Sequence, residues 1–487
     1  MNNPATNLAS GTIRSFDKEA SILLTHAYFL ADDAKEQQIM KPYPPLGILY
    51  LSGFLKEKGV EHQVFDTTFS TKTIFYDYLL EQKPSILAIY INLMTKLDVL
   101  EMIKFVKYHT TLSHTKIVLG GPDVRYNAEN LLNFGADYLV IGEGEETFYE
   151  LIQSSLFETS NRSDGGVFDY SKINGIAYKN KKGEIIITPE RSLKKDLDDL
   201  PMPNRAAIDL NLYLSAWRKH HGESSMTLST MRGCPYTCHW CSRGVYGLSY
   251  RRRSPQKVVQ EIKEIQANYE TDSFWFVDDV FTINHKWLES FVEELEKQKV
   301  TIRYECISRA DRMNEKVIEL LRKSGCFRVW IGAESGSQKI IDLMDRRVKV
   351  ENVQQMIQLT QKVGIEAGTF IMLGYPNETE EDIKNTLIHL KNANPNQFTI
   401  TLTYPIKGTE LYQEVEAHST VNDLDWSATT DRDIDFKRTY SKKYYHHAIQ
   451  WLVNEMAYFQ SKNNSINSLK FKTKSLKARL GMMIEKY

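Results

Sequence analysis

Three cysteines stand close together in this chain, in the segment GCPYTCHWC that covers residues 233–241. The spacing of Cys234, Cys238 and Cys241 is too tight for a disulfide framework, which spreads its pairs over a fold. Thiolates are the natural ligands of iron–sulfur clusters, and a short loop can hold three corners of a cube while the fourth iron has no protein ligand. A substrate with an amine and a carboxylate can chelate that iron. The segment therefore predicts a [4Fe-4S] cluster with one open position.

An alternative use of the same cysteines is a zinc knot, in which His239 or a distant residue supplies the fourth ligand. Structural zinc loops usually use two separated pairs of ligands, so the spacing favours the cluster. The other two cysteines, Cys306 and Cys326, fall within predicted strands. We expect both to be small buried apolar residues.

The cysteine segment follows the first of six predicted strands in the region 223–425. Helical patterns separate these strands, and six such β/α units in series predict a closed or partly closed barrel with its site on the C-terminal rim. The predicted strands are Met226–Met231, Ser273–Val277, Arg303–Ser308, Phe327–Ile331, Thr369–Leu373 and Phe398–Tyr404.

The first 150 residues also alternate strands with helices, and their strands are apolar on both faces. This pattern predicts a parallel sheet covered on both sides, which is a doubly wound (Rossmann-like) domain. Glycines follow two of the strands, at 120–121 and at 142–144, where ligands of such sheets bind. The predicted strands are Ser21–Thr25, His62–Asp66, Ile86–Ile91, Lys116–Leu119 and Tyr138–Ile141.

Four segments result: a doubly wound domain at 1–155, a linker at 156–222 with a hairpin near Lys182, the barrel at 223–425, and a helical segment at 426–487. The net charge of −1 gives no global attraction to nucleic acid or to an anionic membrane. No stretch has the roughly 18 apolar residues of a membrane span, and no signal sequence is visible. We expect a cytoplasmic protein. The basic end, with Lys472, Lys474, Lys477 and Arg479, is usually a solvated helix face, but it could close a cavity or contact an acidic partner.

The motif CxxxCxxC after the first strand of a β/α barrel resembles the radical S-adenosylmethionine (SAM) superfamily over 223–425. The resemblance implies that SAM binds the open iron and that the strand ends around the rim contact it. Glu334 would bind the ribose and Arg346 the carboxylate, with Arg347 as the alternative. The implied SAM contacts are Asp278, Asp279, Ser308, Arg309, Glu334, Arg346, Leu373 and Gly374.

A doubly wound domain ahead of such a barrel resembles the cobalamin-binding domain of cobalamin-dependent radical SAM enzymes, across residues 20–150. The loop Asp-x-His-x-x-Gly of other cobalamin proteins has Pro42 and Pro44 in its place, so the resemblance implies cobalamin without a histidine ligand. The alternative is a domain that binds another small ligand or only docks on the barrel. The implied cobalamin contacts are Tyr43, Pro44, Leu46, Gly47, Asn92, Thr95, Gly120, Gly121, Pro122, Gly142, Glu143, Gly144 and Glu145.

Together these resemblances imply reductive cleavage of SAM to a 5′-deoxyadenosyl radical and methylation of an unactivated carbon of a small molecule. Flavodoxin or ferredoxin would deliver the electron. A second enzyme hypothesis is oxidation or cyclisation without methyl transfer, as in anaerobic porphyrin cyclases. A cobalamin sensor or carrier is the hypothesis of another class, but it leaves the cysteine segment without a function. Methylation requires that the barrel rim face the carboxyl edge of the first sheet.

Overall fold

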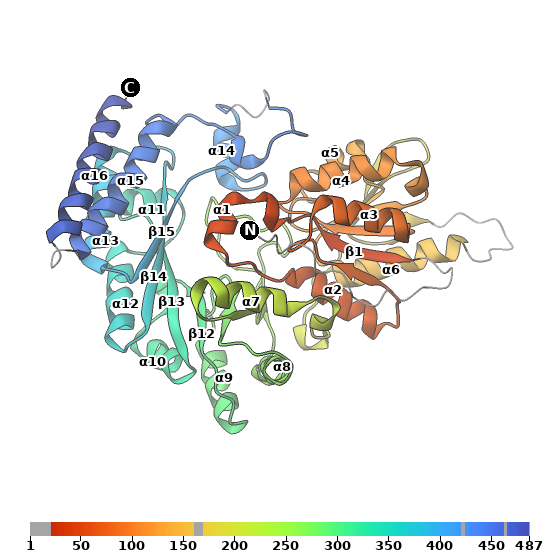
Figure 1. Cartoon of the computed structure of the whole chain (residues 1–487), viewed down its shortest axis with the longest axis horizontal. Helices are drawn as coiled ribbons and strands as arrows, with labels where there is room; N and C mark the ends of the chain where they lie inside the picture. Colours follow the sequence, from red (N-terminus) through yellow and green to blue (C-terminus); the bar gives the residue numbers. More distant parts are fainter. Residues whose placement is uncertain (1–20, 160–168, 420–423, 462–464, 487) are drawn as a thin grey trace, which may run out of the picture.

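The computed structural model describes residues 21–159, 169–419, 424–461 and 465–486. An α/β domain built from the first part of the chain lies beside a second α/β body, and a pair of C-terminal helices covers the outer edge of the latter (Figure 1). Each body has its own hydrophobic core. No helix within these ranges is both long and apolar enough to cross a membrane.

The N-terminal sheet has the order β2-β1-β3-β4-β5-β6-β7, and its first five strands are parallel. Buried apolar clusters lie on both faces, which confirms the predicted doubly wound domain. The order reverses between β1 and β3, and ligands of such sheets bind at this point. Its parallel strands are β1 (Ile22–His26), β2 (Gln63–Phe65), β3 (Ile86–Tyr90), β4 (Lys116–Gly120) and β5 (Tyr138–Val140). The helices between and beside them are α1 (Ala34–Ile39), α2 (Leu46–Glu57), α3 (Lys72–Gln82), α4 (Lys96–Tyr108), α5 (Ala128–Phe134) and α6 (Gly144–Thr159).

The sheet extends beyond residue 155, the predicted end of the domain. The hairpin expected near Lys182 is present, as β6 (Ile176–Lys179) and β7 (Ile185–Ile187), and β6 pairs antiparallel with β5. Part of the predicted linker therefore belongs to the sheet. The physical reason is that β5 would otherwise be an unpaired edge, and an added hairpin satisfies its backbone groups.

The second body is the predicted six-stranded barrel, which stays open between its first and last strands. All neighbouring strands are parallel, in the order β15-β14-β13-β12-β11-β8. The strands are β8 (Ser225–Leu228), β11 (Ser273–Phe276), β12 (Tyr304–Ser308), β13 (Cys326–Glu334), β14 (Glu366–Leu373) and β15 (Gln397–Leu402). The helices of this body are α7 (Leu210–His221), α8 (Pro255–Asn268), α9 (His285–Lys297), α10 (Glu315–Lys323), α11 (Gln338–Leu343), α12 (Val350–Lys362), α13 (Glu380–Ala393) and α14 (Glu410–Glu416).

The first barrel strand is shorter than predicted. It ends at Leu228, and β9 (Met231–Arg232) instead pairs antiparallel with β10 (Arg251–Arg252). The carboxylate of Asp278 accepts hydrogen bonds from the backbone N–H groups of Thr230 (2.7 Å) and Met231 (3.2 Å), and this contact turns the chain just before the cysteine segment. The predicted strand Met226–Met231 was therefore wrong beyond Leu228.

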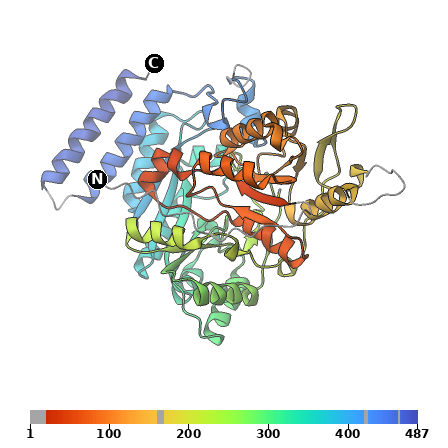
Figure 2. The same ribbon diagram turned by 45° about the vertical axis from the view of Figure 1, so that its right-hand side comes forward.

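The basic C-terminal segment lies on α16 (Ser465–Ile484), which packs against α15 (Lys442–Gln460). Both views show this hairpin at the outer edge of the molecule (Figures 1 and 2). No residue of α15 or α16 lines the cavity described below. The structure therefore does not favour a role for the segment in closing that cavity.

Several polar contacts join the domains, and two groups of them lie at Arg232 and at Thr429. In the first, Arg232 pairs with Glu143 (3.0 Å) and Glu145 (2.5 Å), and Arg251 pairs with Glu143 (2.8 Å). In the second, the segment after β15 returns to the N-terminal domain. There the Nζ of Lys96 donates to the carbonyl oxygen of Thr429 (2.7 Å) and lies over the ring of Trp426.

We expect Glu145→Gln to lower the free energy of unfolding by about 3 kcal/mol, because it leaves part of the charge of buried Arg232 unpaired. Burial alone would raise the pKa of Glu145, but the charge of Arg232 outweighs burial and holds it below its ordinary 4.5. The stabilisation is therefore fully present above pH 4.5 and is lost as the pH falls through the lower pKa of the folded state. Urea unfolding at several pH values measures both effects.

Glu146→Gln is the matched control, because Glu146 is half-exposed and lies 3.6 Å from Arg191. It should change stability by less than about 0.5 kcal/mol. Equal losses from both variants, or a loss in Glu145→Gln that persists in acid, would contradict the prediction.

Candidate functional site

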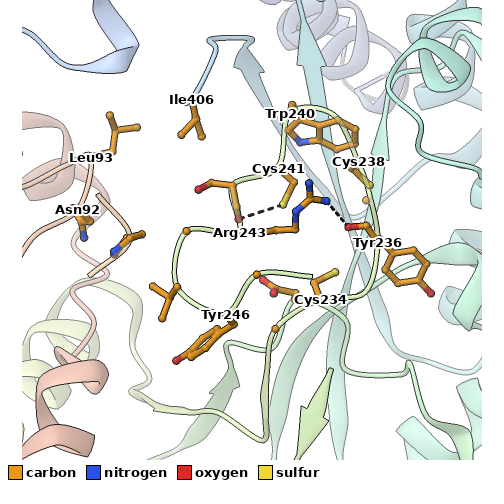
Figure 3. Close-up of a pocket in the computed structure, with 18 of the residues that line it drawn as sticks. Asn92, Leu93, Cys234, Tyr236, Cys238, Trp240, Cys241, Arg243, Tyr246 and Ile406 are labelled. Atoms are coloured by element: carbon orange, nitrogen blue, oxygen red, sulfur yellow. Dashed lines mark hydrogen bonds between the residues drawn. The ribbon is translucent and has the colours of Figure 1, made fainter. Parts of the chain in front are cut away.

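A cavity of about 550 Å³ lies between the two domains. On the barrel side it is lined by the side chains of Cys234, Cys238 and Cys241, and on the other side by the loops after β3 and β4, with Asn92 and Pro122 (Figure 3). These loops are at the carboxyl edge of the N-terminal sheet. The arrangement agrees with the expectation that the barrel rim faces this edge.

The cysteine loop begins at Gly233, whose φ of +82° and contact with Ser249 leave no room for a Cβ. All three cysteines are free thiols, and Cys238 is buried. Cys241 is exposed at the open side of the loop, yet desolvation by the surrounding protein, together with the charge of Asp279, raises the pKa of its thiol to about 12. A thiolate here therefore needs a positive partner such as a metal ion.

The donor set fits an iron–sulfur cube. Among the described residues, no three His, Cys, Asp or Glu side chains converge on a point where a single metal ion would bind. A cube does not require this convergence, because each thiolate binds a different iron. Guanidinium nitrogens of Arg309 and Arg346 lie 3.6 Å and 3.9 Å from Sγ of Cys238, where they suit a negatively charged cluster. His239, the ligand of the zinc alternative, does not line the cavity, and its Nδ1 lies 3.5 Å from Glu414.

Two other predicted residues, Glu334 and Arg346, also line the cavity and are buried. Their nearest charged atoms are 3.5 Å apart, and Glu334, the last residue of β13, has a left-handed φ of +64°. The Nε of Arg346 is buried and has no hydrogen-bond partner among the described residues. A guanidinium group that lines a cavity fits the carboxylate of an amino-acid ligand. Arg347, the alternative, is largely exposed and pairs with Asp345 instead.

The remaining residues that we predicted for SAM divide into two groups. Ser308, Arg309 and Asp279 line the cavity. Asp278 does not, because its carboxylate is used to hold the turn before the cysteine loop. Leu373 and Gly374 also lie outside the lining, and the N–H of Gly374 donates to Glu378 (2.6 Å).

A second cavity, of about 260 Å³, lies over one face of the N-terminal sheet, between α2 and α6. Its floor is apolar, with Leu24, Ala88, Val118 and Val140 from four neighbouring strands. Such an apolar slot fits a flat, apolar group of a ligand, the rest of which would extend past the edge of the sheet. Seven of the residues predicted for cobalamin line it: Gly47, Gly120, Gly121, Gly142, Glu143, Gly144 and Glu145.

The other residues predicted for cobalamin have different positions. Asn92 and Pro122 line the larger cavity, and Leu46 lines a third, smaller one beside Gly47. Tyr43 packs edge-on against Trp217 with ring centroids 5.8 Å apart. Pro44 and Thr95 line neither of the two larger cavities, and Oγ1 of Thr95 accepts from the N–H of Asn92. No histidine in the described part of the chain lines either cavity.

Sequence reasoning missed Tyr246, which lines both cavities. Its ring lies near the guanidinium groups of Arg232 and Arg251, with centroid distances of 5.6 Å and 5.8 Å. It also missed Asp123 and Lys407, which line the larger cavity. The position of Tyr246 five residues after the last cysteine was the only available signal for it.

We expect Gly121→Ala to destabilise the N-terminal domain by about 2 kcal/mol or more, because Gly121 has a φ of +120° that other residues rarely adopt. An added Cβ would also collide with the carbonyl oxygen of Ile91. Thermal unfolding and the absorbance of bound cobalamin measure the effect. Gly120→Ala is the control, because its Cβ would make only ordinary contacts at 3.9 Å. Equal effects of the two variants would contradict this account of Gly121.

Comparison with known proteins gives two family models. The radical SAM superfamily model matches residues 228–390, and the B12 binding domain model matches residues 38–152. The chain is 28% identical over 400 residues to an uncharacterised methyltransferase of Pyrococcus horikoshii, which covers 80% of this chain and 82% of the relative. It is 27% identical over 391 residues to the anaerobic magnesium-protoporphyrin IX monomethyl ester cyclase of Rubrivivax gelatinosus, over 78% and 67% of the two chains.

A solved structure has the same fold. It is the radical SAM methyltransferase TsrM from Kitasatospora setae, with cobalamin and a [4Fe-4S] cluster bound. The TM-score is 0.65 at 18% sequence identity, and the match covers 82% of this chain and 75% of that one. At this identity the likeness shows the fold alone.

Proposed function

Since the chain belongs to the radical SAM superfamily and carries a B12-binding domain, we propose that it methylates an unactivated carbon of a small molecule with a [4Fe-4S] cluster, SAM and cobalamin. One observation carries the proposal. A single cavity is lined by the three thiols and by the carboxyl-edge loops of the B12-binding domain. Groups held by the two domains would therefore meet in one space, which group transfer between them requires.

The cluster would be held by Cys234, Cys238 and Cys241. The guanidinium group of Arg346 would bind the SAM carboxylate, and Glu334 would accept a hydrogen bond from the ribose. Asp279, Ser308 and Arg309 complete the polar lining on this side. Asp278, Leu373 and Gly374 would make no direct contact with SAM, because none of them lines the cavity.

Cobalamin would lie across the carboxyl edge of the N-terminal sheet, with its nucleotide tail in the apolar slot between α2 and α6. The slot and the larger cavity share Tyr246 as a common wall, so a ligand that fills both would contact this ring. When bound, cluster and SAM supply a 5′-deoxyadenosyl radical, and cobalamin supplies the methyl group. Leu93, Phe370 and Ile406 line the cavity and would keep water away from the reacting carbon.

The names of two similar proteins support methyl transfer, since the Pyrococcus relative and TsrM are both called methyltransferases. The Rubrivivax relative supports the second candidate, which is oxidation or cyclisation with the same cofactors. The two outcomes differ in the mass of the product. Methylation adds one methyl group, whereas the second candidate adds oxygen or removes hydrogen.

The test is anaerobic turnover of the protein reconstituted with iron, sulfide and hydroxocobalamin, using SAM with an isotope label in its methyl group and a panel of small molecules. We expect 5′-deoxyadenosine together with a labelled, methylated product. An unlabelled product with added oxygen would overturn methyl transfer in favour of the second candidate. A panel member that binds but yields no 5′-deoxyadenosine would point to a carrier or sensor.

We also propose that flavodoxin or ferredoxin reduces the cluster and that the protein works in the cytoplasm. Low-potential clusters need a donor of this kind, and the cytoplasm keeps thiols reduced. Replacing the chemical reductant by reduced flavodoxin in the same assay tests the donor.

A further inference from the structure

One face of α16 exposes a row of large apolar side chains to solvent. Their exposed fractions are 71% for Leu469, 60% for Leu476, 56% for Leu480, 65% for Met483 and 70% for Ile484. Because an α-helix advances about 100° per residue, the successive spacings of seven, four and three residues from Leu469 to Met483 bring these side chains onto one side, and Ile484 joins them four residues after Leu480. The row runs along most of the helix.

Other residues of α16 pack against the rest of the protein. Ser475, Ala478 and Met482 are almost fully buried and share a different side of α16, toward α15. Figure 2 shows α16 as the outer helix of this pair. The exposed row is therefore not needed to attach the helix, and burial elsewhere holds it in place.

A second row, of lysines, runs beside the apolar one. Lys470, Lys474 and Lys477 are exposed and make no ion pair with any residue that the structure describes. The two other cations of the helix are used within the protein, since Lys472 pairs with Glu455 (2.9 Å) and Arg479 pairs with Glu380. Residues 465–484 contain no Asp or Glu. The outer side of α16 is thus both apolar and positively charged.

We infer that this side of α16 binds the surface of an anionic lipid bilayer. A helix with an apolar row flanked by lysines lies in the membrane interface, where leucines enter the acyl boundary and lysines meet the headgroups. The whole chain has a net charge of −1, so the attraction is local to this helix. An acidic protein partner would need pockets for five large apolar side chains along one straight edge, whereas a bilayer accepts such a row without matched shape.

Flotation of the intact protein with vesicles tests the inference. Vesicles of phosphatidylcholine with about one third phosphatidylglycerol should carry the protein, and vesicles of phosphatidylcholine alone should carry much less, because each lysine contributes about fivefold to anionic binding. Leu476→Gln with Leu480→Gln should weaken binding to the anionic vesicles by about 100-fold, since two leucines no longer enter the apolar layer.

Two matched controls keep the test specific. Lys470, Lys474 and Lys477 changed together to Gln should abolish the preference for anionic vesicles. The same change at Lys179, Lys181 and Lys182, exposed around the β6–β7 hairpin, should leave it intact. Cluster content and circular dichroism of each variant show that it folds.

Three results would overturn the inference. They are failure of the unmodified protein to float with anionic vesicles, equal flotation with both vesicle types, and flotation that the leucine variant does not weaken. A dimer in vesicle-free solution that the leucine variant dissociates would assign the face to a second copy of the chain instead. None of these results bears on the proposed methylation, which depends on the distant cavity.

Discussion

Cys238→Ala is expected to abolish the [4Fe-4S] signal and to reduce turnover by at least about 1000-fold. Cys238 is the most central of the three thiols, because it is buried and has two guanidinium groups within 3.9 Å. With only two thiolates left, a second iron of the cluster would have no protein ligand. Optical and EPR spectra after anaerobic reconstitution measure the cluster, and 5′-deoxyadenosine release measures turnover.

Cys306→Ala is the matched control, because Cys306 is equally buried but lies in the middle of β12 and outside the cavity. It should keep the cluster. Both variants should still bind cobalamin, since the B12-binding domain is separate from the cysteine loop. If Cys238→Ala retained a full cluster signal, or lost cobalamin as well, the assignment of two sites would be wrong.

Arg346→Met should weaken SAM binding by about 100-fold, because it removes a buried charge that pairs with Glu334 and lines the cavity. Burial already raises the pKa of Glu334, and Arg346 opposes this rise. Without Arg346 the pKa of Glu334 should rise further, so residual SAM binding should depend more steeply on pH. Equilibrium dialysis with SAM at several pH values measures both changes.

Arg347→Met is the matched control, because it removes one positive charge without removing the proposed SAM contact of Arg346. Arg347 is 69% exposed and bonds to Asp345 at 2.8 Å, so its removal should change SAM affinity by less than about twofold. The assignment to Arg346 fails if the variant of Arg347 weakens SAM binding more than the variant of Arg346 does.

Local patterns were sufficient to predict the two α/β bodies and the cysteine loop. The apolar strands of the barrel, such as β13 and β14, are continuous in the sequence, and the spacing of the three cysteines is a local signal. The end of the first barrel strand was not predictable in this way. It depends on Asp278, which lies more than 40 residues further along the chain and binds the backbone at Thr230.

Contacts across the domain interface were not predictable from local patterns. Glu143 and Glu145 follow a strand, as ligand-binding residues do, but their carboxylates meet Arg232 and Arg251, which are 87 or more residues away in the sequence. Their residue types gave no sign of this pairing. Likewise, Tyr43 packs against Trp217 of α7, and no pattern near Tyr43 indicates that helix.

The contacts between the domains affect how a ligand can enter and leave the cavity. They include the ion pairs of Arg232, the hydrogen bond from Nε of Arg125 to the carbonyl oxygen of Gly244 (2.8 Å) and the hydrogen bond from Lys96 to Thr429 (2.7 Å), so the domains are held together at several separate points. Entry or exit of a bulky substrate would require several of these contacts between the domains to break together. The rate of this opening would then limit the release of a large product.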